Sequence, residues 1–166
     1  GGFVALKLAT LYPERVKSLS VLGAGWEEPK ENSFFKRALK NSVEKLESNS
    51  GIDPISTFIE HDRKTGLLHK MWVKTLTKNF NDHKALSALL RNLLELQVDK
   101  EDLEKISFPV CIIVGERDPL RKSAEKLHNA LLNSKLTVIP SKNHLTTLFS
   151  SEFHSTLRNF LLTYSN

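Results

Sequence analysis

The sequence has little of what defines several classes of protein. A single cysteine among 166 residues, Cys111, excludes a disulfide within the chain. No apolar run approaches the roughly 20 residues that a membrane-spanning helix needs, so no membrane span is expected. Lysine and arginine exceed aspartate and glutamate by 24 − 19 = 5, but they are scattered among the acidic residues. Without a basic block or a basic and aromatic patch, nucleic acid is not expected as a partner.

The chain also lacks internal repeats and low-complexity segments. Its 166 residues suffice for one domain with a hydrophobic core, whereas complete α/β enzymes commonly have about 200–250 residues. Apart from His144, the histidines show no spacing typical of metal ligands, and neither a metal nor another cofactor is expected. We interpret the other five as structural or solvated: His61, His69, His83, His128 and His154.

The most informative stretch is 108–120, F-P-V-C-I-I-V-G-E-R-D-P-L. Its run 110–114 is apolar throughout, rich in β-branched residues and bounded by Pro109 and Gly115. Such a run predicts a strand buried on both faces, as in the centre of a parallel sheet. Cys111 lies inside this run and is interpreted as a small core residue.

A strand–helix–strand unit begins with this strand. Apolar residues at helical spacing predict a helix over 121–132, and L-T-V-I predicts a second strand over 136–139. Strands joined by one such crossover run parallel, so their carboxyl ends lie at the same edge of the sheet. Asp118 follows the first strand and His144 follows the second, which predicts that the two meet at that edge. The apolar stripe of the helix is formed by Ala124, Leu127, Leu131 and Leu132.

An acid facing a histidine at this edge is the orienting half of a nucleophilic triad, and open α/β sheets bind ligands there. Asp118 precedes Pro119, so it is also a candidate helix N-cap, and the two roles are compatible. Glu116 is the rival acid, which we interpret as a solvated turn residue. We therefore predict Asp118 and His144 as catalytic residues joined by a hydrogen bond of about 2.6–3.2 Å.

Upstream, residues 1–11 are apolar nearly all round and predict a helix buried against a neighbour and ended by Pro13. A strand is predicted over 16–22, where Gly23-Ala24-Gly25 breaks it. The closing segment after His144 predicts an amphipathic helix.

Residues 26–99 contain four predicted helical segments and no predicted strand. Four helices are too many for a single crossover, so we interpret the segment as an inserted helical subdomain, with Asp82 as the cap of its last helix. The chain then divides into 1–25, 26–99 and 100–166. Aromatic and methionine residues of the insert are expected mostly in its core, a minority lining an apolar pocket: Trp26, Phe34, Phe35, Phe58, Met71 and Trp72.

Together these segments resemble the α/β-hydrolase family. The opening G-G-F-V-A-L-K-L-A-T-L-Y-P-E-R-V is similar to the helix after the family's nucleophile elbow, G-x-S-x-G, with Gly1 at its closing glycine. G-E-R-D-P-L resembles the strand end that bears the triad acid, Asp118. I-P-S-K-N-H resembles the turn that bears the triad histidine, His144, and the helical insert resembles the family's cap. One departure is Ser141, where many members have glycine.

The resemblance implies the C-terminal part of an α/β-hydrolase fold, with three parallel strands, flanking helices and an inserted helical cap. It implies a serine, carboxylesterase-like enzyme that acts on a small ester or related acyl substrate. The nucleophile and the oxyanion hole would precede Gly1, so the 166 residues alone are expected to be inactive. Two alternatives stay open: a haloalkane dehalogenase or epoxide hydrolase with an aspartate nucleophile, and a non-catalytic ligand-binding relative.

The same alignment with the family predicts surfaces without their usual cover. One edge of the strand over 16–22 would be unpaired, and part of the apolar helix over 1–11 would be exposed. The 166 residues alone are therefore expected to be poorly soluble or oligomeric.

Overall fold

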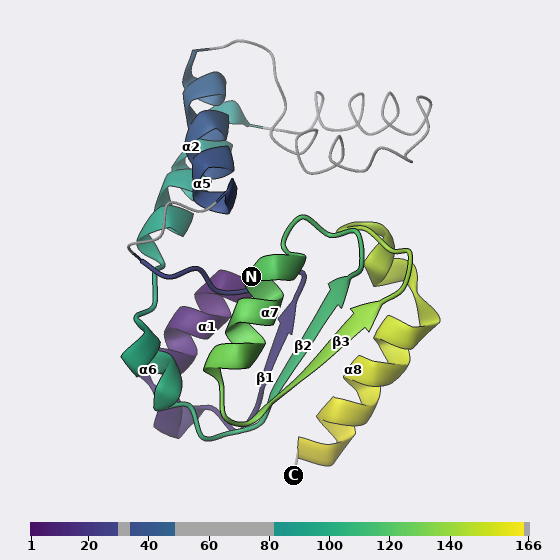
Figure 1. Cartoon of the computed structure of the whole chain (residues 1–166). Coiled ribbons are helices and arrows are strands. Elements are labelled where there is room, and N and C mark those ends of the chain that lie inside the picture. Colours follow the sequence, from purple (N-terminus) through teal and green to yellow (C-terminus); the bar gives the residue numbers. More distant parts are fainter. Residues whose placement is uncertain (30–33, 49–81, 165–166) are drawn as a thin grey trace. The chain divides into compact units, whose positions relative to one another are not determined.

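The computed structural model describes residues 1–29, 34–48 and 82–164 (Figure 1). The chain divides into two compact units, which are described separately. The first unit is formed by Gly1–Glu31 together with Leu96–Asn166, and the second by Asn32–Glu95.

The first unit is built on a three-stranded parallel sheet, as predicted. The order is β1 (Leu19–Leu22), β2 (Val110–Gly115), β3 (Ser134–Ile139). All six residues of the central strand β2 are buried, as expected from its unbroken apolar run. In the described part of the chain β1 pairs only with β2, which leaves its other edge without a strand partner.

The strand β1 is shorter than predicted, because it begins at Leu19 and not at residue 16. The segment before it forms a 3-10 turn, η1 (Pro13–Arg15). The ladder starts where Leu19 N–H donates to Pro109 O over 3.0 Å, and Leu19 is paired with Val110. Pro109 has no N–H to give, so pairing cannot extend further toward the amino end.

Alternate residues of β2 belong to different hydrophobic clusters, because successive side chains of a strand point to opposite faces. Val110, Ile112 and Val114 belong to a cluster with residues of α1 (Gly2–Leu11), α6 (Lys100–Glu104) and α7 (Arg121–Ala130). Cys111 and Ile113 belong to another, with Ile139 and with Phe153 of α8 (Ser151–Tyr164). The sheet thus lies between α1 and α7 on one face and α8 on the other (Figure 1). Burial raises the pKa of the Cys111 thiol, in keeping with its predicted core position.

The predicted apolar stripe of α7 differs from the structure at Leu132, whereas the predicted partial exposure of the apolar helix α1 is confirmed. Leu132 is 89% exposed, because α7 ends at Ala130 and Leu131 is already extended (φ −103°, ψ 132°), so only Leu131 turns inward. The helix α1 buries Leu6 and Ala9, while its opposite side exposes an apolar stripe. This stripe consists of Val4, Leu8, Leu11 and Tyr12, each about half exposed.

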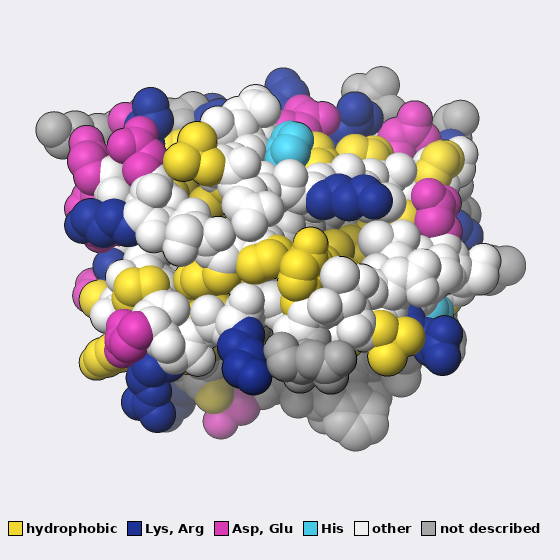
Figure 2. Space-filling view, turned by 90° about the horizontal axis from the view of Figure 1, so that it is seen from below, with side chains coloured by type: hydrophobic (Ala, Val, Ile, Leu, Met, Phe, Trp, Pro, Cys, Tyr) yellow, Lys and Arg dark blue, Asp and Glu magenta, His cyan; other side chains and the backbone are white. Residues whose placement is uncertain are grey.

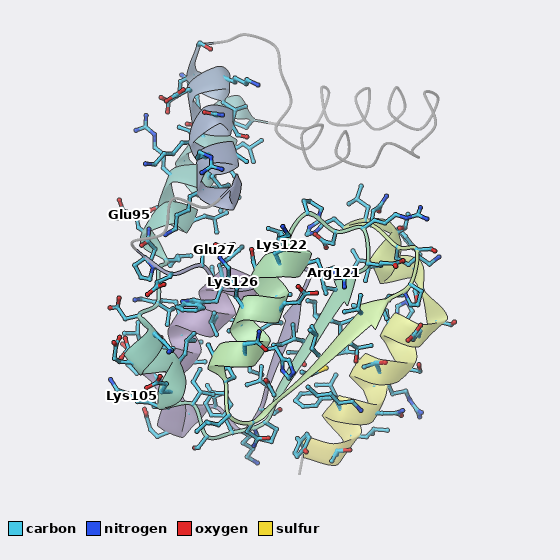
Figure 3. The ribbon with its side chains drawn as sticks, viewed as in Figure 1. Glu27, Glu95, Lys105, Arg121, Lys122 and Lys126 are labelled. Atoms are coloured by element: carbon cyan, nitrogen blue, oxygen red, sulfur yellow. The ribbon has the colours of Figure 1, made fainter. Side chains whose placement is uncertain are left out.

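Trp26 joins two distant parts of the first unit. Its indole Nε1–H donates to Val98 O over 2.7 Å, and its backbone N–H donates to Ser123 O over 2.9 Å. The next residue, Glu27, accepts hydrogen bonds from the Ser123 hydroxyl and from Lys126 Nζ, and its side chain is only 8% exposed. Figure 3 shows Glu27 beside Lys126 at α7. The segment that leaves β1 is therefore fixed to α7 and to the segment that returns to the sheet.

The second unit is described in part. Its helices α2 (Phe34–Glu47) and α5 (His83–Glu95) pack through Leu39, Val43, Leu46 and Leu90. Asp82 Oδ1 accepts from Lys84 N–H (2.9 Å) and Ala85 N–H (3.1 Å), which confirms the predicted cap of α5. Two of the four predicted helical segments of the insert lie outside the described residues, as do Phe58, Met71 and Trp72. In the part of the chain that the structure describes, no helix is long and apolar enough to cross a membrane.

Candidate active site

The strands β2 and β3 end at the same edge of the sheet (Figure 1). Asp118 and His144, which follow these two strands, meet there. His144 Nδ1 lies 2.9 Å from Asp118 Oδ2. The Asp118 side chain is fully buried, whereas that of His144 is 35% exposed. The predicted hydrogen bond is confirmed, and it joins a buried acid to a histidine that solvent or a ligand can reach.

Asp118 is held in place by a turn that directly follows β2. Its backbone N–H donates to Gly115 O over 3.1 Å, and its Oδ1 accepts from Leu120 N–H over 2.8 Å. The N-cap position of α7 is Leu120, so Asp118 closes the turn before the helix and is not its cap. Because Oδ1 is used by the backbone, Oδ2 is directed at His144.

The turn that carries His144, residues 140–144, is bonded to the end of β2. Glu116 N–H donates to Ile139 O over 2.9 Å, and Arg117 N–H donates to Lys142 O over 2.8 Å. The Glu116 carboxylate Oε2 accepts from Ser141 N–H over 2.6 Å. Glu116 is exposed, as predicted, but its carboxylate is hydrogen-bonded to this turn and is not simply solvated. The carboxylate that meets the histidine ring is that of Asp118.

After His144 the chain forms a second short 3-10 helix, η2 (Thr146–Phe149). Asn143 Oδ1 accepts from Leu145 N–H (3.1 Å) and Thr146 N–H (2.9 Å), and the Thr147 hydroxyl donates to Asn143 O (2.6 Å). His144 thus lies between two bonded segments, the turn bound to β2 on one side and η2 on the other.

Ser141 adopts the backbone conformation that glycine favours, with φ 58°. It is the one residue other than glycine with a positive φ in the described ranges. A serine therefore occupies a backbone conformation that favours glycine, the residue that many members of the resembled family have here.

The end of β1 supplies a contact that sequence reasoning missed. Gly23 also has a positive φ, 57°, and its N–H donates to Ile113 O over 2.9 Å. A Cβ placed on Gly23 would lie 3.1 Å from His144 Cε1, 3.3 Å from His144 Nδ1 and 3.7 Å from Asp118 Oδ2. Bare backbone is therefore packed against the acid–histidine pair. The only sequence signal for this contact is that Gly23 directly follows β1, a strand that ends at the same edge of the sheet.

This arrangement can carry protons. An ionised carboxylate only accepts hydrogen bonds, so the contact with Asp118 requires that Nδ1 of His144 carries a proton. In the neutral ring, Nε2 is then the basic nitrogen, and the negative carboxylate stabilises the cation that forms when Nε2 takes a proton. The pair has the geometry that a general base and its orienting acid require.

The other histidines are placed differently where they can be described. His128 Nδ1 lies 2.8 Å from the Ser134 hydroxyl, and His154 makes an edge contact with Phe153 at a ring-centroid separation of 5.3 Å. His61, His69 and the side chain of His83 lie outside the described residues. Among the side chains that the structure describes, no cluster of three or more His, Cys, Asp or Glu residues is suited to a metal ion.

Known proteins resemble this chain in structure only. No family model matches the chain, and no curated protein matches it in sequence. Among solved structures, MenH from S. aureus has a TM-score of 0.74 at 20% identity, over 100% of this chain and 66% of its own. An esterase from Exiguobacterium antarcticum has a TM-score of 0.70 at 20% identity, and the match covers 97% of this chain and 63% of the esterase. MGS-M2, an α/β-hydrolase enzyme from a deep-sea metagenome library, has a TM-score of 0.68 at 22% identity, and the match covers 99% of this chain and 61% of MGS-M2.

These similarities establish the fold. The chain has the α/β-hydrolase fold in part, with a three-stranded parallel sheet and flanking helices, as predicted. It spans 61–66% of the length of the three solved structures named above.

Proposed function

We propose, on the premise of this α/β-hydrolase fold, that the protein hydrolyses an ester or related acyl substrate, with His144 as general base and Asp118 as its orienting acid. The observation that carries the proposal is the 2.9 Å contact between His144 Nδ1 and the fully buried Asp118 Oδ2 at the carboxyl edge of the sheet. Solved structures of similar fold include esterases, which supports an acyl substrate.

In this mechanism His144 Nε2 removes the proton from a serine hydroxyl as the serine attacks the acyl carbon. Asp118 keeps the ring in the required tautomer and stabilises the imidazolium. His144 then returns the proton to the leaving group, and the same steps with water release the acid.

We assign the nucleophile and the oxyanion hole to residues that precede Gly1. The assignment follows from the resemblance of the opening residues to the helix after a nucleophile elbow. It agrees with the partial coverage of the similar structures. On this proposal the 166 residues alone are inactive, and Asp118 and His144 act only in the longer protein.

We further propose that residues 26–99 form an inserted helical cap between core segments 1–25 and 100–166. Their apolar and aromatic side chains would supply the acyl pocket. Asp118 and His144 themselves offer no specificity for one ester, so the cap would decide which small ester or related acyl group is accepted.

Covalent labelling of the full-length protein by a fluorophosphonate tests the proposal. His144→Ala should abolish labelling, because a serine hydroxyl without its base is a weak nucleophile at neutral pH. The matched control is His154→Ala, which removes an exposed histidine on α8 and should label like the unmodified protein.

Three results would contradict the esterase proposal. Labelling that survives His144→Ala would remove His144 from the mechanism. A covalent intermediate trapped from a haloalkane or epoxide in His144→Ala, without fluorophosphonate labelling, would indicate an aspartate nucleophile, which is already ionised. A folded protein that shows neither reaction would favour a ligand-binding relative.

A further inference from the structure

We infer that Glu116 is a positioning residue, which keeps His144 in register with Asp118 by holding Ser141 in a left-handed conformation. The inference rests on the proposed function insofar as His144 is the base. The contact that carries it is the 2.6 Å hydrogen bond from Ser141 N–H to Glu116 Oε2.

Ser141 needs a restraint to keep its left-handed conformation. At φ 58° the Cβ of an L-residue crowds the following carbonyl group, and glycine alone among common residues avoids this cost. A serine in an exposed turn would otherwise relax toward negative φ. The bonds that the left-handed conformation makes possible therefore have to outweigh that preference.

One of the hydrogen bonds between the turn and the end of β2 depends on a side chain. The bonds Glu116 N–H to Ile139 O and Arg117 N–H to Lys142 O join backbone to backbone and are open to any residue type. Only the bond to Ser141 requires a particular side chain, and its acceptor is ionised, which strengthens it. Glu116 is exposed, so its removal changes the restraint on Ser141 without opening a cavity in the core.

The hydrogen bond between Ser141 and Glu116 lies close in sequence to both Asp118 and His144. Glu116 is two residues before Asp118, and Ser141 is three residues before His144, so one hydrogen bond ties together the segments that carry both partners. A change of φ at Ser141 would displace the residues between Ser141 and η2, including His144. It would therefore alter the 2.9 Å separation of His144 Nδ1 and Asp118 Oδ2.

The experiment compares four variants of the full-length protein: Glu116→Ala, Glu116→Gln, Ser141→Gly and the double variant Glu116→Ala with Ser141→Gly. In Glu116→Ala, kcat for an ester should fall roughly tenfold with KM nearly unchanged, since small misplacements of a catalytic group act mainly on the chemical step. Glu116→Gln keeps an acceptor oxygen and should stay close to the unmodified rate. The double variant should regain the rate of Ser141→Gly, because glycine adopts φ 58° without help.

A second readout is independent of turnover. The His144 Nδ1–H proton gives a low-field NMR signal while it is held between Nδ1 and Asp118, and it should broaden or vanish in Glu116→Ala and return in the double variant. The control is Glu14→Ala, which removes an exposed carboxylate from η1, outside the histidine turn, and should leave both readouts unchanged.

Two outcomes would overturn the inference: Glu116→Ala that keeps both the rate and the signal, or a loss that Ser141→Gly does not restore. The second would show that Glu116 acts through its charge and not through the turn. If His144→Ala still labels, the proposed function fails, while the NMR signal and its rescue still decide whether Glu116 positions His144.

Discussion

Replacing Gly23 by alanine should disturb the acid–histidine pair from the β1 side. Gly23 has φ 57° and packs its backbone against His144. The substitution adds one methyl group whose three nearest heavy atoms belong to His144 and Asp118. Its effect should therefore have two parts. The first is the unfolding free energy lost by placing a Cβ at positive φ, and the second is the displacement of the His144 ring by the new methyl group.

The backbone cost is that of a Cβ in the left-handed region, about 1–2 kcal/mol of unfolding free energy. The contact is set by the 3.1 Å between the new Cβ and His144 Cε1, compared with an optimum of roughly 3.5–4.0 Å for two carbons. The ring must therefore withdraw by about 0.4 Å. Along the hydrogen bond, that displacement would lengthen the 2.9 Å Nδ1–Oδ2 contact to about 3.3 Å, outside the usual range.

We expect Gly23→Ala to lower the unfolding free energy by about 1–2 kcal/mol and to slow fluorophosphonate labelling of the full-length protein roughly tenfold. Urea denaturation measures the first quantity and the second-order labelling rate measures the second. Gly23→Asn is the matched variant, since asparagine tolerates positive φ but carries the same Cβ. It should regain most of the stability and remain slow.

The reasoning is refuted if Gly23→Ala labels at the unmodified rate, because the contact with His144 then costs nothing. It is also refuted if Gly23→Asn labels normally while Gly23→Ala does not. In that case the backbone conformation alone, and not the ring contact, would control the histidine.

Two further predictions concern parts of the fold away from the acid–histidine pair. Trp26→Phe removes the indole donor from Val98 O, a buried carbonyl, and should lower the unfolding free energy by about 1–3 kcal/mol. Urea denaturation measures this loss, and a value below about 0.5 kcal/mol would show that the bond contributes little. The 166 residues expressed alone should self-associate, because one edge of β1 has no strand partner among the described residues and α1 exposes Val4, Leu8 and Leu11. A band of hydrophobic side chains also crosses the face seen in Figure 2. A stable monomer in analytical sedimentation, with a cooperative thermal transition, would contradict the second prediction.

The meeting of Asp118 and His144 could be predicted from the sequence because it depends on topology. An unbroken apolar run specifies β2, and one helix between β2 and β3 makes the strands parallel. Residues that follow the two strands must then lie at one edge, whatever the details of the loops. The meeting of Asp118 and His144 needed nothing finer than this rule.

What could not be predicted depends on the exact backbone path. The left-handed conformation of Ser141 and its bond to Glu116 arise in a turn with no periodic pattern. The burial of Leu131 and the exposure of Leu132 depend on where α7 ends, and helical spacing continues past that point in the sequence. The start of β1 depends on its partner, because Leu19 pairs with Val110.

The hydrogen bond between Trp26 and Val98 joins positions 72 residues apart in the chain, so the intervening segment begins and ends at one place. Such a closed loop places little constraint on its own length, since doubling a flexible loop costs only about 0.6 kcal/mol of closure entropy. Insertions, deletions and replacements between the two positions can therefore accumulate while the sheet and its acid–histidine pair stay the same. The bond between the Trp26 indole and the Val98 carbonyl thus marks the point at which the length of the segment and the stability of the scaffold become nearly independent.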